Sequence, residues 1–513
     1  MTPPTHERNY LSGYHTAAGL TGLTGLALLI HGYHFGIEDQ AIYIPAILRD
    51  LNPRLFPRDA TFFESQTHAM LLDKLVAPIV QLSHAPVPWV LFVLHLLTIF
   101  LLLFACSRIV IKLFGNTPSA WGGLALLTCV LTLPVAGTAQ YIADQYLHPR
   151  ALATALILVP IADLLPGTDR RKSRYLVAWC VLWMVLAAAF HFQMALFGVG
   201  LYAFLLPFSF AAETEKSKLA LAFAGIPIIG KLFEPGSDAW QEAARTRGQH
   251  YLLRWSWYEL LGIIAPILLL FWFSSLFRRI DNPKAAWLSQ RLAWFALISL
   301  VVGGALVIPP GLERLTPYQP MRVFILIYAF LALLGGGLLG HFFLKKRYWR
   351  WAALFVPLAA VMCIAQLALF PDSPHIEWPG RSINRPWEQA FLWARVNTPR
   401  DAYFALSPHY LSQRGEDFHG FRAWAWRSQM SDLDKDPGVV SLIPDLAPEW
   451  QREVHALEGW NTFNAGDFTR LKREFGVSWA VLEKRLPDGL PRQVPDNLEC
   501  PYQNSELYVC KIR

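Results

Sequence analysis

Long apolar runs alternate with short polar stretches over the first 370 residues of the chain. A helix that crosses the hydrocarbon core of a membrane needs about 20 mostly apolar residues. One run is short and contains Pro227, which is typical of a half-helix or a re-entrant segment. Counting that run, the pattern predicts about eleven spans, at 14–36, 87–106, 119–137, 149–166, 175–190, 193–210, 219–232, 259–277, 292–309, 322–340 and 351–370.

The last part of the chain, residues 371–513, has no apolar run of spanning length. "PWEQAFLWARVNTPRDAYFAL" predicts a helix, a turn and a strand, and "VSWAVLEK" and "ELYVCKI" have the character of strands. We therefore expect a polytopic α-helical membrane domain over 1–370 and a C-terminal α/β domain over 371–513. The composition agrees, because 16% of the residues are charged, whereas soluble domains have about 25%.

Lysine and arginine are concentrated in one set of loops, including "GTDRRKSR", "RRIDNPKAAWLSQR" and "KKRYWR". Such loops lie on the cytoplasmic side of a membrane. This rule predicts a multi-pass protein of the cytoplasmic (inner) membrane with a cytoplasmic N-terminus and a periplasmic or extracellular C-terminal domain. It also explains much of the net charge of +7, so nucleic acid is not an expected partner. The loops that then face outward are 37–86, 138–148, 233–258 and 310–321.

The cysteines fall into two groups. Cys500 and Cys510 bracket "PYQNSELYV", which reads as two strands joined by a turn. A disulfide between them is expected if this domain lies outside the cytoplasm, and two free thiols are the alternative. The other four lie in or beside apolar runs and are expected to be packing residues: Cys106, Cys129, Cys180 and Cys363.

Two adjacent carboxylates, Glu38 and Asp39, open the first outer loop, 37–86. The segments "QAIYIPAILRDL" and "FFESQTHAMLLDKLVAPIVQL" predict two helices along the membrane interface. A carboxylate in this position can act as a general base, and Asp39 could also hold a divalent cation such as Mg²⁺ or Mn²⁺. The alternative is that these acids only favour the start of the following helix through its dipole.

Cationic side chains are expected on the same outer face. His148 precedes the span at 149–166, and Arg150 lies at its start. Arg254 lies in the outer loop 233–258, Arg322 begins the span at 322–340, and His191 lies between two apolar runs. Such groups can bind a lipid-linked phosphate and stabilise it as a leaving group. They can equally be membrane anchors or, for His191, a packing residue. Together with the acids, they predict glycosyl transfer from a polyprenyl-phosphate-linked sugar, with the acceptor left open.

The segment "DFHGFRAWAWRS" of the C-terminal domain is dense in polar and aromatic residues. Asp417, His419 and Arg422 could line an acceptor site, and Trp424 could stack on a sugar. Alternatively, these residues pack the domain onto a membrane face. The spacing of Asp417 and His419 also suits a metal, although two ligands are weak grounds for a metal site.

Several of these motifs resemble the C-type superfamily of multi-spanning membrane glycosyltransferases. They are the acidic "GIEDQAIY" after the first span, "QYLHPRALA" before the fourth, "AFHFQ" between the fifth and sixth, and an outer domain after the last. With "DFHGFRAWAWRS", the chain is similar to bacterial members of unassigned function. The resemblance implies that Asp39 or Glu38 is a catalytic base or a metal ligand, and that the donor is a polyprenyl-phosphate sugar in the membrane.

Two other classes of function remain open at this stage. A transporter or flippase for a lipid-linked or small anionic substrate would use Glu38, Asp39 and His191 as coupling groups. A non-catalytic membrane scaffold would use the outer domain to bind a partner. The chain has no Gly-rich phosphate loop and no Walker motif, which argues against an ATP-driven pump.

Overall fold

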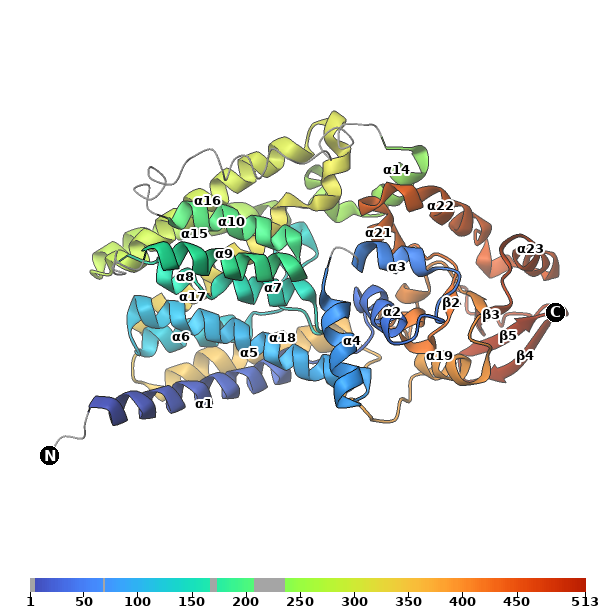
Figure 1. Ribbon diagram of the computed structural model, residues 1–513, viewed down its shortest axis with the longest axis horizontal. Helices are drawn as coiled ribbons and strands as arrows, with labels where there is room; N and C mark the ends of the chain where they lie inside the picture. The colour runs from blue at the N-terminus through green and yellow to red at the C-terminus, as the bar shows by residue number, and fades with distance from the viewer. Residues whose placement is uncertain (1–4, 68–69, 167–172, 207–235) are drawn as a thin grey trace. The chain divides into compact units, whose positions relative to one another are not determined.

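A computed structural model of the chain describes residues 5–67, 70–166, 173–206 and 236–513. The described residues are mostly helical, with one mixed β-sheet near the C-terminus (Figure 1). They divide into two compact units. Unit 1 comprises residues 1–32, 93–234 and 249–366, and unit 2 comprises residues 33–92, 235–248 and 367–513. The first outer loop and part of a later outer loop therefore belong to the same unit as the C-terminal domain.

Unit 1 is built from apolar helices, two of which, α5 and α18, run on into unit 2. Helix α15 begins with a capping box, in which Ser256 and Glu259 satisfy amides of the first turn. His148 and His191 act as N-caps of α7 and α10. The helices are α1 (Thr5–His31), α5 (Val87–Phe114), α6 (Pro118–Cys129), α7 (Pro149–Leu158), α8 (Ile161–Leu164), α9 (Ser173–Phe190), α10 (Phe192–Leu205), α15 (Trp257–Arg279), α16 (Pro283–Val307), α17 (Phe324–Leu339) and α18 (Tyr348–Leu369).

Five helical stretches of the described residues are long and apolar enough to cross a membrane: Val87–Phe114, Trp257–Arg279, Pro283–Val307, Gly311–Leu344 and Tyr348–Leu369. Three apolar helices are shorter, at Thr16–His31, Tyr175–Phe190 and Phe192–Leu205. The predicted spans at 119–137 and 149–166 contain α6 and α7, whose regular helix stops after 12 and 10 residues. The predicted half-helix at 219–232 lies outside the described residues. The protein is therefore an integral membrane protein with fewer full-length spanning helices, among the described residues, than the eleven predicted.

Glycines allow two helices of unit 1 to pack at very short range. A Cβ atom at Gly336 of α17 would lie 2.3 Å from the carbonyl oxygen of Gly122 in α6, and one at Gly123 would lie 2.6 Å from that of Leu333. Small residues at helix contacts bring backbones together in membranes, where apolar side chains gain little by leaving lipid. The packing of α6 against α17 therefore depends on these positions remaining glycine.

Unit 2 combines short helices with a five-stranded sheet of order β2-β1-β3-β5-β4. Strand β1 runs parallel to β2 and β3, and the pairs β3–β5 and β4–β5 are antiparallel. Cys500 of β4 and Cys510 of β5 form a disulfide. The strands are β1 (Tyr403–Ala405), β2 (Ser428–Gln429), β3 (Trp479–Glu483), β4 (Leu498–Gln503) and β5 (Leu507–Ile512).

The first outer loop contributes three helices to unit 2. Helix α2 contacts α3, α4 and α20, so that in Figure 1 the blue α2 and α3 lie beside orange C-terminal elements. Residues Gln40 to Leu48 of α2 are all buried, so α2 has no continuous polar face of the kind expected from its sequence. The helices of the unit are α2 (Gln40–Leu51), α3 (Ala60–Thr67), α4 (Leu72–Ser83), α14 (Asp238–Arg245), α19 (Pro386–Asn397), α20 (Phe421–Ala425), α21 (Asp436–Leu442), α22 (Ala447–Ala456) and α23 (Ala465–Phe475).

Candidate functional site

The adjacent acids Glu38 and Asp39 lie in unit 2, immediately before α2. Glu38 has a φ of 51°, a left-handed conformation that is uncommon for a residue other than glycine. Its backbone amide donates a hydrogen bond to the carbonyl oxygen of Phe418 at 3.1 Å. Each of the two acidic side chains is 34% exposed. The C-terminal segment thus holds the acid pair in a strained turn, and strain of this kind is often found at functional sites.

A lysine from the C-terminal segment faces both acids. The ammonium group of Lys435 forms an ion pair with Glu38 Oε2 and lies 3.7 Å from Asp39 Oδ1. The lysine side chain is only 10% exposed, and burial lowers the pKa of Lys435 to about 7. The direct contact engages Glu38 more closely than Asp39. The two neighbouring carboxylates are therefore not equivalent.

Further charges surround this lysine. Arg247, from the segment 235–248, donates a hydrogen bond to the carbonyl oxygen of Lys435 at 3.0 Å. Burial lowers the pKa of Arg247, and the charges of Asp39, Asp432 and neighbouring acids partly offset this effect. Burial, together with repulsion from Asp436, raises the pKa of Asp432 to about 7. Three segments that are distant in sequence therefore contribute charges to one surface region of unit 2, which we call the acid-pair cluster (Glu38, Asp39, Arg247, Asp432, Lys435 and Asp436).

These contacts bear on the divalent cation that the sequence allows at Asp39. Magnesium and similar ions require several oxygen ligands with space for water around them. Here the ammonium group of Lys435 lies against Glu38 and near Asp39, and Arg247 adds a second positive charge. These cations already compensate the carboxylates, so the residues present do not fit a bound cation.

The residues predicted to line an acceptor site are buried in unit 2. Arg422 is 4% exposed and binds Asp59 through Nε at 2.6 Å and Asp436 through both Nη atoms at 2.8 and 3.0 Å. Asp417 accepts a hydrogen bond from the amide of Asp372 at 2.9 Å. Trp424 is 9% exposed and packs edge-on against Phe35, with ring centroids 5.2 Å apart. Each of these contacts is made to another part of the unit, as expected for packing residues.

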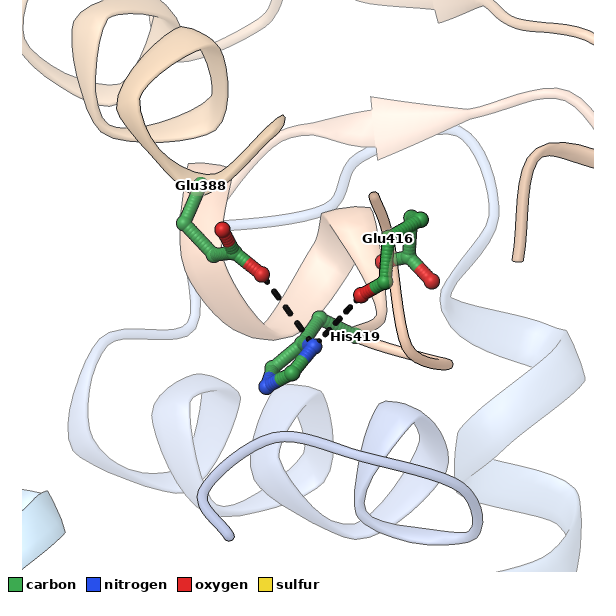
Figure 2. A group of neighbouring side chains, drawn as sticks. All are labelled: Glu388, Glu416 and His419. Atoms are coloured by element: carbon green, nitrogen blue, oxygen red, sulfur yellow. Dashed lines mark hydrogen bonds and ion pairs between the residues drawn. The ribbon is translucent and has the colours of Figure 1, made fainter. Parts of the chain in front are cut away.

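His419, the remaining predicted acceptor residue, lies in a buried network with Glu377, Arg385, Glu388 and Glu416. Its Nδ1 donates to the carbonyl oxygen of Glu416 at 2.7 Å, and its Nε2 lies 2.9 Å from Glu377 Oε1 and 3.1 Å from Arg385 Nη1. Glu388 Oε1 lies 3.1 Å from the same Nδ1, and a dashed line marks this pair in Figure 2. Although burial disfavours the charged imidazole, the charges of Glu377 and Glu388 raise the pKa of His419. Because a carbonyl oxygen can only accept a hydrogen bond, Nδ1 carries a proton.

Glu388, Glu416 and His419 could hold a metal ion, because their ligand atoms all lie within 4.8 Å of one another. However, His419 Nδ1 would have to lose the proton that it donates to Glu416. Burial and the charge of Glu388 raise the pKa of Glu416 well above its usual value. Burial likewise raises the pKa of Glu388. The carboxyl oxygens of Glu388 and Glu416 are buried and make no hydrogen bond to the described residues, so the network leaves these two groups without hydrogen-bond partners.

In unit 1, four of the predicted phosphate-binding residues lie near one another. The rings of His148 and His191 have centroids 6.3 Å apart, and the electrostatic neighbours of His191 include Arg150 and Arg322. Arg150 is 3% exposed and pairs with Asp144 at 2.7 Å. The fifth predicted residue, Arg254, instead stacks over the ring of Tyr251 at 4.5 Å. We call the four residues His148, Arg150, His191 and Arg322 the cationic group.

The two histidines of the cationic group are N-caps with a defined tautomer. His148 Nδ1 accepts the amide hydrogen of Arg150 at 2.9 Å, and His191 Nδ1 accepts that of Met194 at 3.3 Å. A nitrogen that accepts a hydrogen bond carries no proton, so in each neutral ring the proton is on Nε2. Arg322 hydrogen-bonds Gln319 through Nε at 2.9 Å and Gln193 through Nη1 at 3.4 Å. The group therefore offers imidazole and guanidinium donors, which suit a phosphate.

No family model matches the sequence, and no curated protein matches it. Among solved structures, the chain is similar to the apo form of the oligosaccharyltransferase of Archaeoglobus fulgidus. That match has a TM-score of 0.40 and 11% sequence identity, and it covers 91% of this chain and 69% of the other. At this level the similarity carries no argument about activity, which has to come from the residues themselves.

Several charged residues of these clusters were not found by sequence reasoning. Lys435 and Asp432 lie in "SDLDKD", which reads as a solvated charged loop, and Glu388 is one polar residue in a predicted helix. Neither pattern indicates burial. Arg247 is one of several arginines in the segment 233–258, and its sequence context does not distinguish it from the others. The several acids beside a lysine in "SDLDKD" are the one sequence pattern that could have indicated the acid-pair cluster.

Proposed function

We propose that this protein is a membrane glycosyltransferase that moves a sugar from a polyprenyl-phosphate-linked donor to an acceptor hydroxyl, with Asp39 as the general base. The observation that carries the proposal is the unequal environment of the acid pair. Lys435 forms ion pairs with both acids, which are equally exposed, but it is in direct contact with Glu38 and lies 3.7 Å from Asp39. An ionised carboxylate that is partly exposed can accept a proton from an incoming hydroxyl.

The reaction is balanced as follows. Asp39 takes the proton of the acceptor hydroxyl, while the oxygen of that hydroxyl bonds to the anomeric carbon of the donor sugar. The bond between that carbon and the phosphate oxygen breaks, and the phosphate leaves with the electron pair. Because a phosphate departs readily without protonation, one base is sufficient, unlike the paired carboxylates of soluble glycosidases.

The cationic group is assigned to the donor phosphate in this proposal. The Nε2–H groups of His148 and His191 and the guanidinium group of Arg322 are donors suited to phosphate oxygens. Arg150 is fixed by Asp144 at 2.7 Å, so we assign it to orienting the His148 end of α7 rather than to a primary phosphate contact. The expected orientation, with these groups and unit 2 on the outer side of the inner membrane, is part of the same proposal.

The test is a transfer assay with the purified full-length protein and a panel of polyprenyl-phosphate sugars. Asp39→Asn keeps the shape of the side chain but not its basicity, and we expect transfer to fall about 10²- to 10⁴-fold. Asp50→Asn is the matched control, because Asp50 lies on α2, the helix that follows Asp39, but pairs with the exposed Lys74 at 2.5 Å. Unchanged transfer in both Asp39→Asn and Glu38→Gln would remove the assignment. Movement of the donor lipid across the membrane without sugar transfer would support a flippase instead.

A further inference from the structure

A hollow lined by lysines lies at one end of the helices of unit 1, apart from the cationic group. Its volume is about 580 Å³, and its wall includes Ser119, Lys284, Lys345 and Lys346. The end of α5, the start of α6, the end of α15, the start of α16 and the end of α17 all border it. Since successive helices reverse direction here, these residues lie at the boundary between lipid and water. We call this hollow the basic pocket.

The charge of the basic pocket is uncompensated. Its wall has three lysines against one acid, Asp281, with His341 beside them. Within the described part of the chain, none of the three ammonium groups takes part in a salt bridge or hydrogen bond. The side chains of Lys345 and Lys346 are exposed, and that of Lys284 is half-buried. An anion entering the pocket would therefore meet available donors without first breaking an ion pair.

The start of α6 adds partial positive charge. Pro118 occupies its first turn, and Thr117 makes no capping hydrogen bond there, since its hydroxyl donates to the carbonyl of Phe114 at 3.0 Å. The amide groups of the first turn thus lack a side-chain cap at a helix end that favours anions. Helix α16 also begins at the pocket, although Asn282 caps the amide of Ala285.

The inner wall of the pocket is apolar, with Leu113, Phe114 and Phe277 among the lining residues. A free inorganic anion has no apolar groups that could contact these side chains, whereas a phospholipid has glycerol and methylene groups directly below its phosphate. Basic pockets between membrane helices bind anionic lipid headgroups in this way. The lysines therefore suit the phosphate of a phospholipid, and the aromatic side chains suit its glycerol and methylene groups.

We propose that the basic pocket binds the phosphate headgroup of an anionic phospholipid. This site is separate from the proposed transfer chemistry and does not depend on it. The lysines are assigned to the phosphate, and the start of α6 supplies amide hydrogen-bond donors at the same place. A zwitterionic lipid has a compensating ammonium or choline group, so it would bind less well.

The experiment measures one-to-one binding of short-chain phosphatidylglycerol to the delipidated full-length protein in neutral detergent, by native mass spectrometry. The pocket variant is Lys284→Gln/Lys345→Gln/Lys346→Gln. The control variant, Lys112→Gln/Arg279→Gln/Arg347→Gln, removes the same charge from residues that do not line the pocket. Because five of the six side chains are exposed and Lys284 is half-buried without an ion pair among the described residues, both variants are expected to fold.

We expect the pocket variant to bind phosphatidylglycerol about tenfold or more weakly and the control variant to bind within about twofold of wild type. Phosphatidylcholine is expected to bind wild type weakly, and inorganic phosphate to compete poorly. Equal weakening in the two variants, or no saturable binding by wild type, would overturn the proposal. Inorganic phosphate that binds as tightly as the lipid would show a simple anion site and overturn the lipid assignment.

Discussion

Replacing Arg422 with methionine tests whether the buried ion pairs hold unit 2 together. The guanidinium group binds Asp59 and Asp436 through three contacts of 2.6 to 3.0 Å, and all three side chains are at most 4% exposed. The variant Arg422→Met would leave two carboxylates buried without their partner. Removal of one partner from a buried pair costs about 3–5 kcal/mol. For a domain of about 150–250 residues this lowers the melting temperature by about 6–20 °C.

The assay is thermal unfolding of the full-length protein in one detergent, followed by tryptophan fluorescence. Arg473→Met is the control, because Arg473 is 72% exposed and pairs only with its neighbour Glu474; exposed pairs contribute about 0–1 kcal/mol. The triple variant Arg422→Met/Asp59→Asn/Asp436→Asn is expected to recover part of the lost melting temperature, because none of these three buried positions then carries a charge. If Arg422→Met melts at the same temperature as Arg473→Met, the ion pairs do not stabilise the unit and the reasoning fails.

Three further predictions concern other parts of the molecule. Burial raises the pKa of Asp432 to about 7 in the folded state. The folded state therefore keeps a proton that the unfolded state releases above about pH 4. As a result, the contribution of Asp432 to the free energy of unfolding falls as pH rises from about 4 to 7. Asp432→Asn removes this fall, as melting curves across that range would show, and parallel curves for the two proteins would contradict it. Thiol labelling of the unfolded protein is expected to modify four cysteines before reduction and six after, because Cys500 and Cys510 form a disulfide; its loss lowers the free energy of unfolding by about 2–3 kcal/mol. Gly336→Ala would place a Cβ atom 2.3 Å from a carbonyl oxygen of α6 and is expected to cost about 1–3 kcal/mol in thermal unfolding. Gly335→Ala is the tolerated control, because its Cβ atom would meet Phe273 at 3.5 Å and Leu126 at 4.0 Å, both ordinary contact distances.

The class of fold could be predicted from the sequence because hydrophobic runs and the polar C-terminal part are properties of composition. The lengths of the helices could not. Residues 119–137 are apolar throughout, yet α6 ends at Cys129, since hydropathy shows that a segment suits lipid but not how long it stays helical. The assignment of the first outer loop to the same unit as 371–513 was also not visible, because contacts distant in sequence leave no local pattern.

For the candidate site residues too, local chemical type could be predicted from the sequence, whereas contacts between distant segments could not. His148 and His191 stood out because ionisable groups are rare beside apolar runs, and the structure brings their rings within 6.3 Å. Arg422 and Trp424 stood out for their chemical type, but their burial against Asp59 and Phe35 depends on segments more than 350 residues away. Lys435 did not stand out at all, since a lysine among aspartates is usually solvated.

Unit 2 is assembled from three stretches of chain, and this has a consequence for biogenesis. Asp59 finds its partner Arg422 only 363 residues later. At about 5–20 residues per second, the ribosome needs roughly 20–70 s to cover that distance. Throughout that interval the loop 37–86 lacks the arginine that neutralises Asp59. A chaperone or the insertion machinery that shields this loop would therefore affect the yield of folded protein, and strains lacking such help would degrade the nascent chain first at 37–86.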